Sequence, residues 1–246
     1  MSQLQKFGTY TADAAAKARK EESSSSWLKL SPGTNIIRLL PPLVGMIEPW
    51  VTIYQHFIKL PGEGNRLVFN CPRRMNNERC PSCEKGDRLR ATGRPADEKA
   101  AREWFPGQRN IAFAIDREDP EKGIQILGFG ATIKNRLRHF REKLKKDITS
   151  FDKGFDIVIE RMGQGLNTEY QVDLGEQCPI LDNMTQLEEW AADLPDLQDF
   201  AKVLPYETII EKFAAANGVE PPAGPKQVGG TVQDDDNELD DSETPY

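Results

Sequence analysis

The chain has 246 residues, of which 38% are hydrophobic and 29% are charged. This length suits one or two domains, and the modest hydrophobic share predicts disordered segments beside the core. No hydrophobic run approaches the roughly 18 residues that span a bilayer, and no secretion signal follows Met1. We therefore expect a cytoplasmic protein without a membrane partner. Four cysteines without an export signal favour a metal site or free thiols over a disulfide framework.

The formal net charge of −7 conceals a strong asymmetry along the chain. Residues 1–175 carry 29 basic and 22 acidic side chains, whereas residues 176–246 carry 3 and 17. Within the first part, residues 56–146 hold 21 basic and 12 acidic side chains. A basic body joined to an acidic end is typical of proteins that interact with nucleic acid.

The first 26 residues contain too few hydrophobic side chains to build a core, so we expect a flexible amino-terminal arm. Lys6, Lys17, Arg19 and Lys20 make it positive. Such an arm is either a solvated terminus or a functional extension, and the sequence leaves both open.

Residues 27–178 read mainly as short strands. The segments 27–30 and 36–40 flank a Ser-Pro-Gly-Thr-Asn turn and predict a hairpin. Further strands are expected, in chain order, at 50–58, 109–115, 124–129, 155–159 and 168–174. One helix is expected at 133–146, where Ile133, Leu137, Phe140 and Leu144 recur at helical spacing.

The expected fold class is mainly β, or α+β overall, with an OB-like barrel as its core. A zinc subdomain at about 56–107 would be inserted in this barrel. Residues 179–220 switch to helical periodicity and predict a helical appendage. Residues 221–246 begin with a Pro/Gly-rich linker. They end in the segment 231–246, whose seven acidic and no basic side chains predict a disordered tail.

The strongest chemical signal is the set His56, Cys71, Cys80 and Cys83. The Cys80-Pro-Ser-Cys83 spacing lets two thiolates reach one tetrahedral ion, and Cys71 and His56 complete a Cys₃His set. Three soft thiolates favour Zn²⁺. We expect one structural zinc ion, because four protein ligands leave no open position for a reacting water.

The fourth ligand has two competitors in the sequence. His139 lies within the expected basic helix, and Cys178 precedes Pro179 at the end of the barrel-like region. We expect His139 to face solvent or phosphate and Cys178 to be a plain small side chain, which leaves His56 as the preferred ligand.

Cationic and aromatic side chains are interleaved through the basic region. A protein that binds a single-stranded nucleic acid needs cations for the phosphates and flat rings on which the unstacked bases can stack. Phe113, Phe129 and Phe140 are expected in the core. The candidate nucleic-acid contacts are Trp50, Tyr54, Lys59, Arg66, Arg73, Arg74, Trp104, Phe105, Arg109, Lys134, Arg138 and Tyr170.

The order of the metal-ligating residues resembles the zinc site of the T-even phage helix-destabilising proteins, which bind single-stranded DNA. Residues 108–116 with 124–130, and 154–156 with 163–170, are similar to strand pairs of that family. The resemblance implies a non-catalytic protein that coats single-stranded DNA in phage replication, recombination and repair, inside the host cell. It further implies that the tail 231–246 recruits replication and recombination proteins and that the arm supports self-association along DNA.

Two other classes of function compete with this interpretation. A zinc-containing transcription or adaptor protein would bind duplex DNA or a polymerase, with 133–146 as the only candidate recognition helix. A nuclease would use Asp116, Glu118 and Asp119, which we assign instead to a solvated turn beside Pro120. No catalytic constellation is found, so we do not expect an enzyme.

Overall fold

The computed structural model describes residues 27–60, 66–145, 147–192 and 194–216. The predicted arm 1–26 and the predicted linker and tail 221–246 lie outside these residues. Eight strands are present, namely β1 (Trp27–Leu28), β2 (Gly33–Leu39), β3 (Trp50–Lys59), β4 (Arg66–Asn70), β5 (Gly107–Asp116), β6 (Ile124–Phe129), β7 (Gly154–Met162) and β8 (Glu169–Cys178). The described α-helices are α2 (Pro72–Asn76), α3 (Pro81–Arg90), α4 (Pro95–Arg102), α5 (Ala131–Leu144), α6 (Met184–Ala191) and α7 (Tyr206–Ala215).

All eight strands belong to one mixed sheet, in which the order β1-β6-β5-β2-β7-β8 forms the main path. Strand β3 pairs with β5 and carries β4 on its other edge. Every pairing is antiparallel except that of β1 with β6. In the described part of the chain, no pairing joins β1 to β8, so the sheet stays open, and the predicted OB-like barrel stays a prediction.

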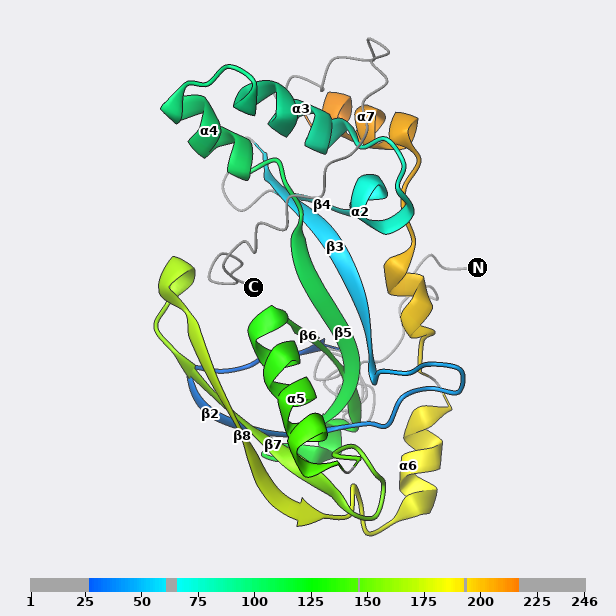
Figure 1. The fold of residues 1–246 in the computed structure, drawn as a ribbon. Coiled ribbons are helices and arrows are strands. Elements are labelled where there is room, and N and C mark those ends of the chain that lie inside the picture. Colours follow the sequence, from blue (N-terminus) through cyan, green and yellow to red (C-terminus); the bar gives the residue numbers. More distant parts are fainter. Residues whose placement is uncertain (1–26, 61–65, 146, 193, 217–246) are drawn as a thin grey trace, which may run out of the picture.

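The molecule has two lobes connected by the long strands β3 and β5 (Figure 1). One lobe contains most of the sheet together with α5, and the other contains α2, α3, α4 and α7 (Figure 1). We call the second the metal lobe, for residues 56–60, 66–105 and 204–215, because it holds the four metal-ligand candidates.

Helix α5 closes one face of the sheet, as its sequence predicts. Ile133, Leu137 and Phe140 are buried against the core of the sheet lobe, whereas the basic residues of the helix lie on its exposed sides. The predicted core positions Phe113 and Phe129 are each 2% exposed, and Phe140 is 8% exposed. These three core assignments are therefore confirmed.

The opposite face of the sheet is covered by the segment that follows β8. Leu187 of α6 and Leu197 of the 3₁₀ helix Leu197–Ala201 pack against Ile53, Phe113 and Ile126 of the sheet. Helix α7 then reaches the metal lobe, where Ile209 and Phe213 are fully buried. The helices predicted at 179–220 thus extend along the molecule and contact both lobes (Figure 1).

Two local expectations differ from the structure. Strand β1 does not form a hairpin with β2; it pairs in parallel with β6, and β2 lies between β5 and β7. The predicted hairpin is therefore wrong. The second difference concerns residues 72–102, where we predict no helix from the sequence and the structure contains α2, α3 and α4.

A buried arginine connects the centre of the sheet to the chain around β7. Arg38 of β2 is fully buried and donates to the carbonyl oxygens of Ser150 at 2.7 Å and Cys178 at 2.9 Å. Its guanidinium also lies 3.7 Å from Asp156. These bonds compensate for burying a charge, which would otherwise be costly.

None of the helices in the described ranges has the length and hydrophobicity needed to cross a membrane.

Candidate metal centre and nucleic-acid interface

Four consecutive elements, β3, β4, α2 and α3, bring the four metal-ligand candidates together. His56 lies on β3, in register with Phe69 of β4. Cys71 follows β4 directly and caps α2, where its Sγ accepts a hydrogen bond from the backbone N–H of Arg74 at 3.4 Å. Cys80 precedes α3 and Cys83 lies in its first turn. Each cysteine lies at or near a helix start, and the three thiols meet beside His56 of β3.

The ligand atoms form a compact cluster with the dimensions of a tetrahedral site. All four lie within 4.8 Å of one another. Cys71 Sγ is 3.5 Å from Cys83 Sγ, and His56 Nε2 is 3.2 Å from Cys80 Sγ and 3.8 Å from Cys83 Sγ. A tetrahedron with metal–sulfur bonds of about 2.3 Å has sulfur–sulfur edges of about 3.8 Å. The four side chains therefore have the spacing needed to hold one metal ion.

Burial makes the negative charge of this cluster difficult to carry without a cation. All four side chains are at most 1% exposed. Hydrogen bonds from Cys80 and Cys83 lower the pKa of the Cys71 thiol. The reciprocal bond to Cys71 raises the pKa of Cys80 to about 12 and also raises the pKa of Cys83. One thiolate is thus stabilised at the expense of the other two, and a divalent cation would allow all three to ionise.

Aromatic packing holds the histidine in place. The ring of Phe69 stacks on the imidazole of His56 at 4.9 Å, and Phe213 of α7 meets Phe69 edge-on at 6.1 Å. Nδ1 of His56 is buried without a hydrogen-bond partner among the described residues. Ring packing, together with the contact of Nε2 with the thiols, therefore orients the imidazole.

The two competing ligands lie elsewhere. His139 is exposed on α5. Cys178 ends β8, where its Sγ accepts a hydrogen bond from Arg117 at 3.6 Å. Neither belongs to the cluster, so the choice of His56 as the fourth ligand agrees with the geometry.

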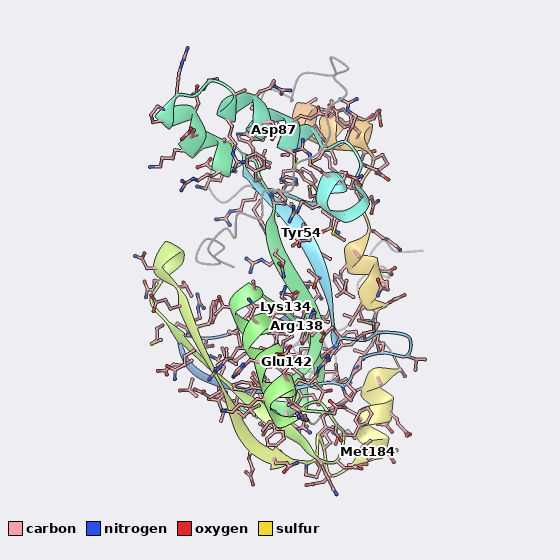
Figure 2. The ribbon with its side chains drawn as sticks, viewed as in Figure 1. Tyr54, Asp87, Lys134, Arg138, Glu142 and Met184 are labelled. Atoms are coloured by element: carbon pink, nitrogen blue, oxygen red, sulfur yellow. The ribbon has the colours of Figure 1, made fainter. Side chains whose placement is uncertain are left out.

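Three of the predicted base-stacking rings lie in or beside the metal lobe, each covered by a cation. Lys85 Nζ lies 4.0 Å from the ring centre of Trp104, and the Arg90 guanidinium lies 4.1 Å from that of Phe105. The Arg74 guanidinium lies 4.9 Å from the ring of Tyr54, which Figure 2 places on β3 between the lobes. All three rings are half-buried, so the metal lobe and the adjoining part of β3 present aromatic rings and positive charge together.

Other predicted cations of the metal lobe are partly engaged in ion pairs. Arg73 contacts Asp87 at 2.6 Å, and Lys59 contacts Glu103 at 3.8 Å. Arg66 is exposed at the start of β4.

Two predicted cations lie on the other lobe. Lys134 and Arg138 follow one another along α5 (Figure 2). The Arg138 guanidinium lies 3.2 Å from Glu48, and its side chain remains 44% exposed.

Three predicted contacts lie deeper than expected. Trp50 is only 5% exposed and packs edge-on against Phe129 at 5.8 Å, so the structure places it in the core rather than on an open stacking surface. Arg109 is 9% exposed and lies 5.5 Å from the ring of Phe57. Tyr170 is half-buried against the core of the sheet lobe.

The contribution of α7 to the metal lobe escaped sequence reasoning. Tyr206 donates a hydrogen bond to Glu84 at 2.9 Å, and the Arg79 guanidinium lies over the Tyr206 ring at 4.6 Å. Phe213 packs against Trp104 at 5.8 Å. More than a hundred residues separate these partners, so no local pattern connects them. The helices of the lobe did carry a local signal, since Pro72, Pro81 and Pro95 each occupy the first helical position.

The carboxylates considered for a nuclease have local partners. Asp116 accepts a hydrogen bond from the backbone N–H of Glu118 at 2.9 Å, and Asp119 pairs with Lys122 at 3.0 Å. Across the ranges that the structure describes, the Cys₃His tetrad is the only cluster of three or more potential ligands.

Comparison with known proteins agrees with this arrangement. A family model described as "gp32 DNA binding protein like" matches residues 31–215, which include both lobes. The chain is also similar to the "Probable ssDNA-binding protein" of Escherichia phage T5, with 27% identity over 177 residues. That match covers 68% of this chain and 64% of the relative. Since the family model matches well over half of the residues, the chain belongs to the gp32-like family of DNA-binding proteins.

Proposed function

We propose that this protein binds and coats single-stranded DNA without catalysing a reaction. Family membership and the name of the phage T5 relative support this proposal. The observation that carries it is the group of half-buried rings at Tyr54, Trp104 and Phe105, each beside a cation. Bases of a single strand would stack on such rings, with each stack contributing about 1–3 kcal/mol, while the neighbouring cations neutralise phosphates.

The tetrad would hold one zinc ion. Three buried thiols and one imidazole are the ligand chemistry that zinc prefers. The ion would neutralise the thiolates and stabilise the lobe, a contribution on the order of 10 kcal/mol. His56 would anchor β3 to the ion, and Cys71 would anchor the start of α2. Cys80 and Cys83 would anchor the start of α3. Trp104 and Phe105 pack on this cluster, so the ion would position the stacking rings indirectly.

The wider biological roles follow from the family and from the charge of the chain. We place the protein in the host cell of a phage, where it would protect single-stranded DNA during replication, recombination and repair. The acidic segment 231–246 would recruit replication and recombination proteins, and the basic arm 1–26 would support contacts between copies along DNA. The OB-like barrel belongs to the same proposal.

The proposal is tested by titrating the protein with single-stranded and duplex oligonucleotides across a salt series while tryptophan fluorescence is recorded. We expect tighter binding to the single strand. Log K should fall with log salt at about −0.7 per phosphate neutralised. Equal affinity for both strand states would contradict the proposal and favour the duplex-binding adaptor. Cleavage of DNA in the presence of Mg²⁺ would favour the nuclease.

A further inference from the structure

A pocket of about 410 Å³ lies between α5 and the segment that joins β2 to β3. Its hydrophobic lining comes from Pro42, Ile47 and Pro49 of that segment and from Trp50, Leu137 and Ile148. The volume falls within the range of about 300–1,000 Å³ that is usual for small-ligand pockets. This pocket is separate from the rings of the metal lobe.

A row of cations leads into the pocket. Lys134, Arg138, Arg141 and Lys145 recur at spacings of four, three and four residues, which places them along one side of α5 (Figure 2 labels Lys134 and Arg138). The last three line the pocket. Glu48 accepts hydrogen bonds from Arg138 and Arg141, each at 3.2 Å, and so holds both guanidiniums at the rim. Both arginine side chains remain nearly half exposed.

One further feature suits the pocket to a ligand. Ile47 is 85% exposed although it lines the pocket, so a ligand that enters from solvent can pack on its side chain.

We propose that this pocket binds one nucleotide of the single strand, with the base against Ile47 and its phosphate at Arg138 and Arg141. The inference rests on the proposed function and adds a second contact region outside the metal lobe. Three cations and two carboxylates, Glu48 and Asp147, line the pocket. The lining therefore carries one net positive charge. This charge suits a nucleotide, which has one negative charge on its phosphate, better than it suits the densely acidic segment 231–246.

The test compares two substitutions in the same exposed loop of the full chain. Ile47→Asp places a carboxylate on the pocket, whereas Val44→Asp makes the same charge change at a residue that is fully exposed and lies outside the lining. We expect Ile47→Asp to weaken binding of a thymidine oligonucleotide about tenfold, the effect of losing one base contact. Val44→Asp should change it less than twofold. Thymidine monophosphate, tested in parallel, should bind far more weakly than the oligonucleotide if the site serves a strand.

A second measurement locates the base directly. An oligonucleotide carrying 5-iododeoxyuridine should crosslink on irradiation to peptides containing residues 42–50 or 137–149. Crosslinks confined to the metal lobe, or equal effects of the two substitutions, would overturn the inference while leaving the proposed function intact. A peptide of residues 231–246 that binds the wild type but not Ile47→Asp, with oligonucleotide affinity unchanged, would overturn it in favour of a protein ligand. Failure of the wild type to bind the oligonucleotide would refute the proposed function itself.

Discussion

Gly86 lies where helix α3 passes against the ring of Phe105. A Cβ added at this glycine would meet the Phe105 ring at 2.7–3.2 Å, closer than real side chains approach. The Arg90 guanidinium, one turn further along the same helix, lies 4.1 Å from the centre of that ring. The absence of a side chain at residue 86 therefore leaves room for the tip of the ring against the helix backbone.

Gly86→Ala should destabilise the protein, although alanine is ordinarily the better helix former. In a solvent-exposed helix the change would stabilise by about 1 kcal/mol, whereas overpacking against the ring costs about 1–3 kcal/mol. We expect a net loss in the free energy of unfolding measured with urea. Gly107→Ala is the control, because nothing lies within 4 Å of its added Cβ. Unchanged or increased stability of Gly86→Ala would show that Phe105 moves aside without cost.

Replacing one candidate ligand should abolish metal binding. Cys83→Ser keeps the side-chain size but removes a thiolate, so we expect bound zinc, measured by mass spectrometry, to fall from one per chain to near zero. Thermal stability and affinity for single-stranded DNA should fall with it. Cys178→Ser is the matched control, because Cys178 lies outside the cluster. Metal retained by Cys83→Ser and lost by Cys178→Ser would mean that the ligand set is wrong.

At the scale of single residues, chemistry that depends on residue type and order was predictable. His56 and the three cysteines were identified because few other roles suit three cysteines within a short, charged segment. Burial of individual rings was harder to predict. Trp50 and Tyr54 lie on the same strand, four residues apart, yet one is in the core and the other lies between the lobes. Trp50 is covered by α5, which comes from a distant part of the sequence, whereas Tyr54 lies under Arg74 of α2.

At the scale of elements, helix α7 fastens the end of the described chain to the metal lobe. Burial, followed by the hydrogen bond to Glu84, raises the pKa of Tyr206 to about 12. Ile209 and Phe213 of the same helix are fully buried beside the cysteines. The attachment of α7 and the integrity of the metal lobe therefore depend on each other.

Tyr206→Phe should cost about 1 kcal/mol at pH 8, the usual contribution of a partly exposed hydrogen bond. The phenol must be protonated to donate to Glu84, and its pKa is raised in the folded protein. The stabilisation is therefore complete below pH 10 and is lost as the pH rises toward about 12. Urea unfolding at pH 8 and pH 11.5 should show that the wild type loses more stability than Tyr206→Phe. Because other groups titrate alike in both proteins, parallel losses would contradict the assignment.

The sequence predicted which segments form helices and strands better than it predicted which strands pair. The helical spacing at 133–146 predicted α5, and alternation predicted β5 and β6. The prolines at the starts of α2, α3 and α4 signalled helices that the polar composition obscured. The partner of β1 could not be predicted, because a short strand beside a turn suits a hairpin as well as the parallel pairing with β6.

At the scale of the whole molecule, the net charge of −7 is the sum of two opposed parts. Residues 231–246 contribute seven acidic and no basic side chains, and the lobes carry the cations beside the rings and at the pocket that we propose to bind DNA. A polyanion joined to a surface that binds polyanions would compete with DNA for it, since both are attracted by the same charges. The segment would then be released for other proteins when DNA binds.

Truncation after residue 226 tests this competition, since it removes all seven acidic side chains of 231–246 and brings the formal charge to about zero. We expect affinity for single-stranded DNA to rise about tenfold at 50 mM salt and much less at 300 mM, where screening shortens the reach of the charges. A full-length control with Asn and Gln at these acidic positions should behave like the truncation, because the effect depends on charge rather than on length. Affinity unchanged at every salt concentration would instead make 231–246 a tether, and the binding surface would then be open to DNA at all times.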